Sequence, residues 1–135
     1  MDPPVVRSAR TMLMPYIPVA IINIVNGQRF DCYALIDSGA SMSLFPAVVA
    51  TAIGIGQVEN DMGESFCGIA SQQATGYPHA VRLEVGGNGF DTSIYFSQQV
   101  GEETLLLGMK GFFDLFTVKI DTKKERIELA VIGGK

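Results

Sequence analysis

The stretch Ala34-Leu35-Ile36-Asp37-Ser38-Gly39-Ala40-Ser41 places an acid directly after an apolar run and before several small residues. The apolar run indicates a buried strand. A carboxylate at the end of such a strand is costly unless it is hydrogen-bonded. Gly39 lets the backbone turn sharply and bring an N–H close to the anion. By itself, Asp-Ser-Gly is also typical of an ordinary turn in which Asp37 bonds its own backbone.

A second motif lies much later in the chain. Three leucines and a glycine, Leu105-Leu106-Leu107-Gly108, precede Met109-Lys110-Gly111-Phe112-Phe113. Together with the Asp37 loop, this motif resembles the retropepsin family, the retroviral and retroviral-like aspartic proteases. That family has Asp-Thr/Ser-Gly-Ala on one loop, and three apolar residues and a Gly crossing beneath it before a short helix. The order of elements resembles the family over residues 16–131, and the two motifs are its specific part.

The resemblance implies a role for each matching residue of the first motif. Asp37 matches the catalytic aspartate. Ser38 matches the hydroxyl residue that bonds across a dimer to the equivalent loop of the partner. Gly39 matches the residue whose backbone borders the carboxylates and the substrate. Ala40 matches the small residue that lines the pocket nearest the scissile bond.

In the second motif, Leu107 and Gly108 match the element that supports the catalytic loop from below. Retroviral members often place an Arg after this Gly, paired with an acid four residues past the catalytic Asp. Here those positions hold Met109 and Ser41, so both partners of that ion pair are absent. Ser41 instead resembles the pepsin-like pattern, in which a Ser hydroxyl bonds the catalytic carboxylate. This departure predicts a weaker dimer and favours a cellular or bacterial-type relative.

A substrate-covering flap is expected within residues 66–77. Its tip is predicted at Gly68, Ile69, Ala70 and Ser71, which would contact the substrate. Loops that close over a substrate must open to admit it. The alternative for this segment is a plain exposed loop.

Period-two alternation of apolar residues dominates the chain and predicts an all-β protein. The resemblance implies a retropepsin-like half-barrel assembled as a two-fold homodimer. Asn26-Gly27 is a strong signal for a type I′ hairpin turn, which requires positive φ twice. Residues 56–76 are expected to form a long loop or a loose hairpin. Strands are predicted over residues 16–25, 29–36, 81–85, 90–96, 105–107, 116–120 and 127–131.

One or two short helices are also expected. Pro46 is a favourable first helical residue because its missing N–H is not needed there. Residues 47–53 would complete this helix, and Gly54 would end it. Residues 111–115 are predicted to form one or two further helical turns.

The chain has 135 residues, which fits a single domain over residues 1–135, with residues 1–15 as a flexible N-terminal arm. The net charge is −4, which argues against a nucleic-acid partner. Hydrophobic residues make up 47 % of the sequence, and the mean hydropathy is +0.27. This surplus suggests apolar surface covered by a partner subunit, although a sticky monomer would have the same composition.

Cysteine and histidine carry little information. Cys32 and Cys67 match no metal or redox spacing, so we expect buried free thiols, with a single disulfide left open. His79 is the one histidine, so a zinc site would lack ligands. A Cys–His nucleophilic pair has no supporting signature. No metal and no cofactor are expected.

No targeting segment is predicted. The sequence begins without a basic region followed by an apolar run. The apolar run at residues 17–25 is too short to span a bilayer. A cytoplasmic location is favoured, and a fragment of a longer, anchored protein is left open.

The resemblance implies an aspartic endopeptidase that acts on peptide or protein substrates. The chain holds one Asp-Ser-Gly, so a catalytic pair of aspartates would need Asp37 from each of two subunits. Strands near Val5 and residues 127–131 are natural candidates for pairing between the subunits. The rival interpretation is a non-catalytic module that uses the same fold to bind a peptide or to dimerise a larger protein.

Overall fold

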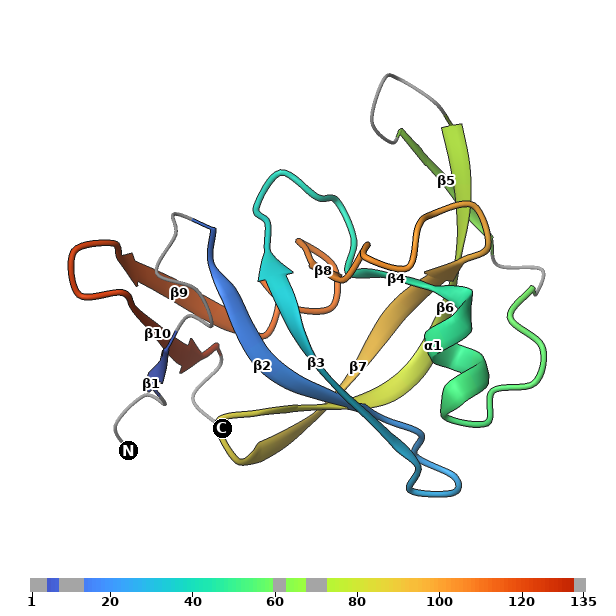
Figure 1. Ribbon diagram of the computed structural model, residues 1–135, viewed down its shortest axis with the longest axis horizontal. Coiled ribbons are helices and arrows are strands. Elements are labelled where there is room, and N and C mark those ends of the chain that lie inside the picture. Colours follow the sequence, from blue (N-terminus) through green and yellow to red (C-terminus); the bar gives the residue numbers. More distant parts are fainter. Residues whose placement is uncertain (1–4, 8–13, 60–62, 68–72, 133–135) are drawn as a thin grey trace.

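The computed structural model describes residues 5–7, 14–59, 63–67 and 73–132, and these residues are mostly strand (Figure 1). This confirms the predicted all-β class. The described elements are β1 (Val5–Arg7), β2 (Tyr16–Ile22), β3 (Arg29–Ile36), β4 (Leu44–Pro46), α1 (Ala47–Ala52), β5 (Glu64–Cys67), β6 (Gln73–Val85), β7 (Asn88–Ser97), β8 (Leu106–Leu107), β9 (Phe116–Asp121) and β10 (Arg126–Val131).

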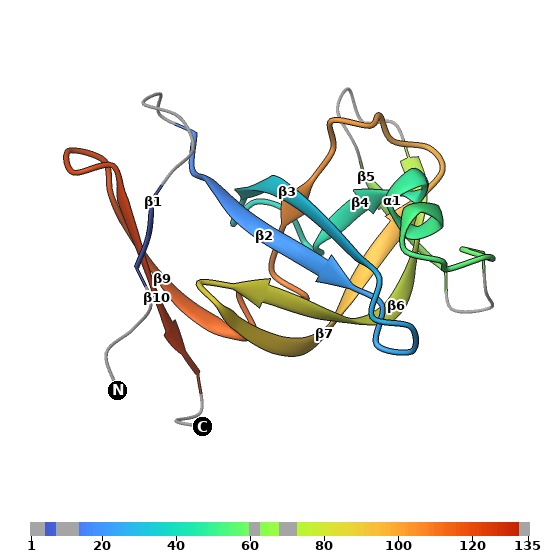
Figure 2. The same ribbon diagram turned by 60° about the horizontal axis from the view of Figure 1, so that its bottom comes forward.

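The larger sheet has seven strands in the order β2-β3-β8-β4-β7-β6-β5. Strand β2 also pairs with β6, so the sheet curls round and closes on itself, as the two ribbon views show (Figures 1 and 2). Parallel pairing joins β3 to β8 and β4 to β7. This closure brings the end of β3 next to β8, a segment far away in the sequence.

The core lies inside the curled sheet. It consists of inward-facing residues along the strands, together with a group of phenylalanines. Phe90 and Phe116 meet edge to face with their ring centroids 4.8 Å apart, a favourable geometry for aromatic pairs. Complete burial of one such side chain contributes about 1.5–3 kcal/mol. The largest fully buried side chains are Phe45, Phe96, Phe112, Phe116, Ile17, Ile21, Ile53, Leu83, Ile94, Leu107, Ile127 and Leu129.

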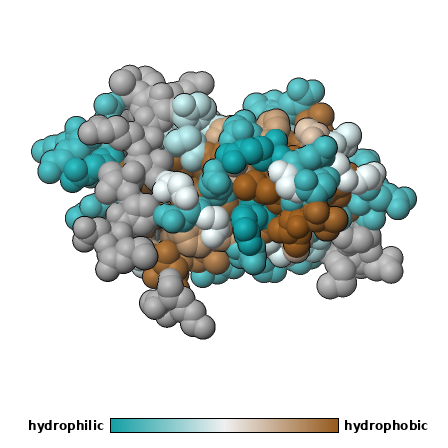
Figure 3. Space-filling view, turned by 90° about the horizontal axis from the view of Figure 1, so that it is seen from below, coloured by the Kyte–Doolittle hydropathy of each residue, from teal (hydrophilic) through white to brown (hydrophobic). Residues whose placement is uncertain are grey.

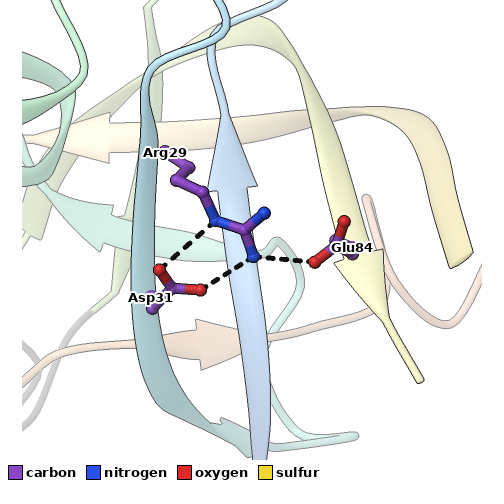
Figure 4. Close-up of polar contacts among 3 residues, drawn as sticks. All are labelled: Arg29, Asp31 and Glu84. Carbon is purple, nitrogen blue, oxygen red and sulfur yellow. Dashed lines mark hydrogen bonds and ion pairs between the residues drawn. The ribbon is translucent and has the colours of Figure 1, made fainter. Parts of the chain in front are cut away.

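A charged network crosses the outer face of the sheet (Figure 4). Arg29 on β3 bonds Asp31 on the same strand at 2.9 Å and Glu84 on β6 at 2.7 Å. Strand β2 lies between β3 and β6, and its small Ala20 stands opposite both Asp31 and Glu84. A residue as small as Ala leaves room for the long Arg side chain to pass over β2. The network therefore joins the strands on either side of β2.

The turn between β2 and β3 differs from the prediction. Gly27 has φ +76°, but Asn26 is outside the left-handed region, so this is not a type I′ turn. Residues 24–27 form a longer loop, closed by bonds from Gly27 N–H to Asn23 O and from Asn23 N–H to Gln28 O. The Asn26 side chain accepts from Gln28 N–H and donates to Ile53 O. The loop is thus shaped by contact with the end of α1, which a local turn rule does not include.

The helices follow the prediction in part. Helix α1 begins after Pro46, which is the last residue of β4 and the N-cap rather than the first helical residue. Gly54 has φ +84° just beyond the helix, in keeping with a helix end. Residues 112–115 form a turn closed by a bond from Phe116 N–H to Phe112 O, not a helix. One short helix is therefore present among the described residues.

The segment predicted as a loop or loose hairpin contains paired strands. Strands β5 and β6 are antiparallel, with Glu64 opposite Gly76 and Ser65 opposite Thr75. In Figure 1 this hairpin projects away from the body of the molecule.

A small second sheet has the order β1-β10-β9. Val5, Val6 and Arg7 pair with Glu128, Ile127 and Arg126 of the same chain. Pairing within the chain thus occupies backbone groups that were expected to join two subunits. Residues 5–7 of the predicted arm belong to this sheet.

Apolar side chains remain on the surface. Figure 3 shows apolar and polar residues interspersed on the face seen from below. Among the described residues, the most exposed large hydrophobic side chain is Val25, at 91 %, in the loop between β2 and β3. Part of the apolar surplus of the sequence is therefore at the surface. Within the same part of the chain, no helix is long and apolar enough to cross a membrane.

Candidate active site

Two segments that are distant in the sequence position Asp37. Strand β3 runs parallel to β8, with Ile36 opposite Leu107. The backbone N–H of Asp37 donates to the carbonyl oxygen of Leu107 over 2.9 Å, and Leu35 N–H donates to Leu105 O over 2.8 Å. Leu107 is fully buried. Strand pairing therefore continues up to the acid itself and fixes where the loop begins.

The loop also holds the carboxylate from within. Gly39 N–H donates to Asp37 Oδ1 over 2.9 Å, and Ala40 N–H donates to Asp37 O over 3.1 Å. This is the local turn that Asp-Ser-Gly alone would predict. What distinguishes it from an ordinary turn is the buried strand before it and β8 beside it. Asp37 is half-buried, whereas Ser38 and Gly39 are exposed, so the loop faces solvent.

Gly108 packs against the returning part of the loop. A Cβ on Gly108 would overlap Met42 O and lie 2.7 Å from Ala40 O, which is too close for any side chain. Next to it, Met109 N–H donates to Ala40 O over 2.8 Å and Lys110 N–H to Ser41 O over 3.1 Å. The segment after β8 is therefore bonded directly to the residues after Asp37.

Ser43 is a supporting residue that the sequence analysis missed. It is fully buried, and its Oγ accepts a bond from Gly108 N–H over 3.0 Å. Its own backbone N–H donates to Lys110 O, and its carbonyl accepts from Tyr95 N–H. A hydroxyl residue between the apolar Met42 and Leu44 was the available signal. A buried polar side chain in such a place needs a partner, and Gly108 provides it.

The pepsin-like role suggested for Ser41 remains a prediction. Its side chain is exposed, and within the described part of the chain no hydrogen bond joins its hydroxyl to the Asp37 carboxylate. Met109, at the position of the retroviral Arg, is 49 % exposed. The two positions of the viral ion pair are therefore occupied by an exposed hydroxyl and a partly exposed apolar side chain.

The segment predicted to contain the flap, residues 66–77, includes the end of β5 and the start of β6. Phe66 is opposite Ala74 and Cys67 is opposite Gln73, which are the last described pairs of these two strands. The expected tip residues Gly68, Ile69, Ala70 and Ser71 lie outside the described residues. Their role in substrate binding remains a prediction.

Cys32 is a free, half-buried thiol on β3. Burial, together with the charge of neighbouring Asp31, raises the pKa of Cys32 to about 12. A neutral thiol is a poor nucleophile and a poor metal ligand. Over the described ranges, no group of three or more His, Cys, Asp or Glu side chains is placed to hold a metal ion.

The arrangement of the strands is the retropepsin-like fold. Three solved structures are similar to this chain: a retropepsin-like aspartic protease, a retroviral protease-like domain and a viral protease. A retropepsin-like aspartic protease from Rickettsia conorii aligns with a TM-score of 0.62 and 16 % identity, over 93 % of this chain and 96 % of its own. The retroviral protease-like domain of Ddi1 from Leishmania major aligns with a TM-score of 0.63 and 17 % identity, over 92 % and 98 %.

The EIAV protease in complex with the inhibitor HBY-793 aligns over less of the chain. Its TM-score is 0.52 at 17 % identity, and the match covers 71 % of this chain and 82 % of that protease. No protein-family model and no curated protein sequence matches the chain. The chain therefore has the retropepsin-like fold, established by structure at low sequence identity.

Proposed function

We propose that the protein is an aspartic endopeptidase that works as a homodimer, with Asp37 contributed by each subunit. The observation that supports this most strongly is the bond from Asp37 N–H to Leu107 O. This bond fixes the start of the exposed loop that begins at the half-buried Asp37, in a fold shared with aspartic proteases. An ordinary Asx turn would not need that second support.

A dimer is required by the chemistry. The sequence has one Asp-Ser-Gly, and Asp31, Asp91, Asp114 and Asp121 are not followed by such a motif. A single carboxylate cannot act as base and proton donor in the same step. A two-fold axis between two copies of the Asp37 loop would supply the second group. It would also bring each Ser38 hydroxyl, which is exposed here, towards the partner loop.

The proposed reaction is hydrolysis by an activated water. Two carboxylates held close together repel each other when both are charged, so the pair shares one proton. The ionised group takes a proton from water, which attacks the peptide carbonyl, and the protonated group donates to the carbonyl oxygen. The shared proton belongs to the pair, so neither Asp37 is assigned as the acid.

The exposed Met109 supports a dimer through this face. Its N–H is bonded to Ala40 O, so the side chain lies beside the Asp37 loop. An apolar side chain that is 49 % exposed gains stability when a second copy covers it. Without the ion pair of the viral pattern, the association is expected to be weaker than in viral enzymes.

The decisive experiment is cleavage of a denatured protein at mildly acidic pH. Asp37→Asn should abolish cleavage and keep the fold, because Asn is nearly isosteric but cannot act as base or share the proton. The matched control is Asp91→Asn, which makes the same change at an exposed carboxylate on β7 that bonds Arg82. Full cleavage by purified Asp37→Asn would refute the proposal. Wild-type protein that binds peptide without cleaving it would support the non-catalytic module.

A mixing experiment tests the shared pair directly. Increasing amounts of Asp37→Asn, added to a fixed amount of wild-type chain, should suppress activity, because mixed dimers have one Asp37. Adding Asp91→Asn should instead raise total activity. Specific activity should also rise with protein concentration until dimers saturate, in parallel with sedimentation. Activity that stays constant on dilution of a monomer would contradict the dimer.

A further inference from the structure

The base of the β5–β6 hairpin is attached to the body of the molecule mainly through side chains. Strand β6 pairs with β7 from Tyr77 to Val85. Residues 73–76 of β6 pair with β5 instead. Between Gln73 and Gly76, β6 therefore pairs with β5 and no longer with β7, and the described part of the hairpin projects from the rest of the sheet (Figure 1). Its position relative to the Asp37 loop has to be set by other contacts.

Glu64, the first residue of β5, makes the principal contacts. The Tyr95 hydroxyl on β7 donates to Glu64 Oε2 over 2.6 Å. The Lys110 ammonium approaches Glu64 Oε1 at 3.3 Å and lies 5.9 Å from the centre of the Tyr95 ring. The bond from Tyr95, followed by that from Lys110, lowers the pKa of Glu64. The carboxylate thus links three segments that are distant in the sequence.

Both partners of Glu64 are bonded to the segment between Asp37 and β4. Tyr95 is buried against Met42 and Leu44, and its N–H donates to Ser43 O. Lys110 donates its backbone N–H to Ser41 O and accepts from Ser43 N–H through its carbonyl oxygen. A displacement of the hairpin at Glu64 is therefore transmitted to residues 41–44 through two short connections.

Gly76, at the base of the hairpin, allows close packing beside the contact between Glu64 and Tyr95. A Cβ on Gly76, opposite Glu64, would lie 3.3 Å from Tyr95 Cβ, 3.4 Å from Met42 Sδ and 3.5 Å from Leu44 Cδ1. Gly76 thus lets the hairpin base sit against the Met42, Leu44 and Tyr95 cluster. On the return strand, Thr75 N–H donates to the Gln99 side chain over 2.6 Å.

We infer that Glu64 is a positioning residue, which, through Tyr95 and Lys110, holds the β5–β6 hairpin in place relative to the Asp37 loop. The catalytic consequence rests on the proposed endopeptidase function, whereas the effect on the hairpin does not. Exposed ion pairs contribute little to global stability. Loss of this contact therefore opens the hairpin locally and leaves the rest of the fold intact.

Hydrogen exchange of amides in residues 73–77 tests the contact. Glu64→Gln and Tyr95→Phe should each raise exchange there by about fivefold, the factor that corresponds to one typical hydrogen bond. The double variant should show little more than either single change. Tyr95→Phe keeps the packed ring, and Glu128→Gln, which removes a carboxylate bonded to Lys119 in the other sheet, is the control. Unchanged exchange at 73–77 in both single variants would overturn the inference, as would a uniform rise over the whole chain.

Kinetics separate positioning from a merely structural role. Glu64→Gln should raise KM several-fold with little change in kcat, because it weakens the placement of the hairpin and leaves the Asp37 pair intact. Lys110→Arg should retain activity and Lys110→Met should behave like Glu64→Gln. A fall in kcat with an unchanged KM would overturn the positioning role. If wild-type protein cleaves nothing, the proposed function fails, while the exchange result still decides the hairpin contact.

Discussion

The N–H of Asp37 donates to the carbonyl oxygen of Leu107, so the acid and its support are joined by one backbone bond of 2.9 Å. That bond extends the parallel pairing of β3 and β8 into the loop. Backbone bonds between paired strands leave little freedom for the residue that ends the strand. The position of Asp37 therefore depends on how closely the segment around Gly108 packs against the Asp37 loop.

Replacing Gly108 with Ala should disrupt that packing. The added Cβ would overlap Met42 O and Ala40 O. We expect a loss of about 3 kcal/mol in the free energy of unfolding, the upper end of the usual cost of overpacking. Urea denaturation measures it. Gly56→Ala is the matched control, because a Cβ added there would have no neighbouring atom within 4 Å. A Gly108→Ala protein as stable as wild type would contradict the close packing.

Ser43→Ala should destabilise the same region by removing an acceptor. Gly108 N–H would lose its partner in a buried site, which costs about 1–3 kcal/mol. The exposed Ser93 on β7 offers a control, since Ser93→Ala removes a hydroxyl at the surface. Denaturation midpoints of the two variants give the comparison. Equal midpoints would mean that the bond to Gly108 contributes nothing.

The network of Arg29 should give a salt-dependent contribution to stability. Its side chain and those of Asp31 and Glu84 are all partly exposed, so solvent screens the pairs. Arg29→Met should lower the free energy of unfolding slightly at low salt. The loss should be smaller at 1 M salt, where screening acts over about 3 Å. Arg82→Met, which removes a single pair with Asp91, should have a smaller effect. A loss independent of salt would point to packing of the Arg stem.

Cys32 should react slowly with alkylating reagents in the native protein. Its pKa is raised to about 12, so the folded state favours the neutral thiol. The contribution of the neutral Cys32 thiol to the free energy of unfolding is fully present below the ordinary thiol pKa. It is lost as the pH rises towards 12. Alkylation at pH 8, followed by mass spectrometry of the Cys32 peptide, should be at least about tenfold slower than in denaturant. Equal rates would show that Cys32 is accessible.

The hairpin contact at Glu64 should persist in acid. Because its pKa is lowered from the ordinary value of 4.5, its contribution is present above that value and is lost only as the pH falls through the lower, folded pKa. The Tyr95 hydroxyl and the Lys110 ammonium face it, and both keep their protons over this range. Exchange at residues 73–77, corrected for intrinsic rates, should therefore be the same at pH 5 and pH 7. Loosening between these values would contradict the lowered pKa.

Local patterns predicted much of what surrounds Asp37. The apolar run before the acid, the small residues after it and the second run ending at Gly108 each have a local physical cause, namely strand burial or a requirement for a small residue. For the same reason, alternation located most of the strands. Local rules were less reliable where a residue contacts a segment distant in the sequence. The Asn26 side chain bonds the end of α1, and the backbone at Asn26 does not adopt a type I′ turn.

The amino-acid sequence by itself determined most of the strands and the acid at the end of one of them, because these depend on neighbours along the chain, whereas the supporting role of Gly108 was implied by the family resemblance. The tertiary structure alone decided that Ser43 bonds Gly108 and that Glu64 meets Tyr95 and Lys110. Those pairs depend on the order of strands in the sheet. No periodicity encodes that order, because it follows from how the whole chain closes around its core.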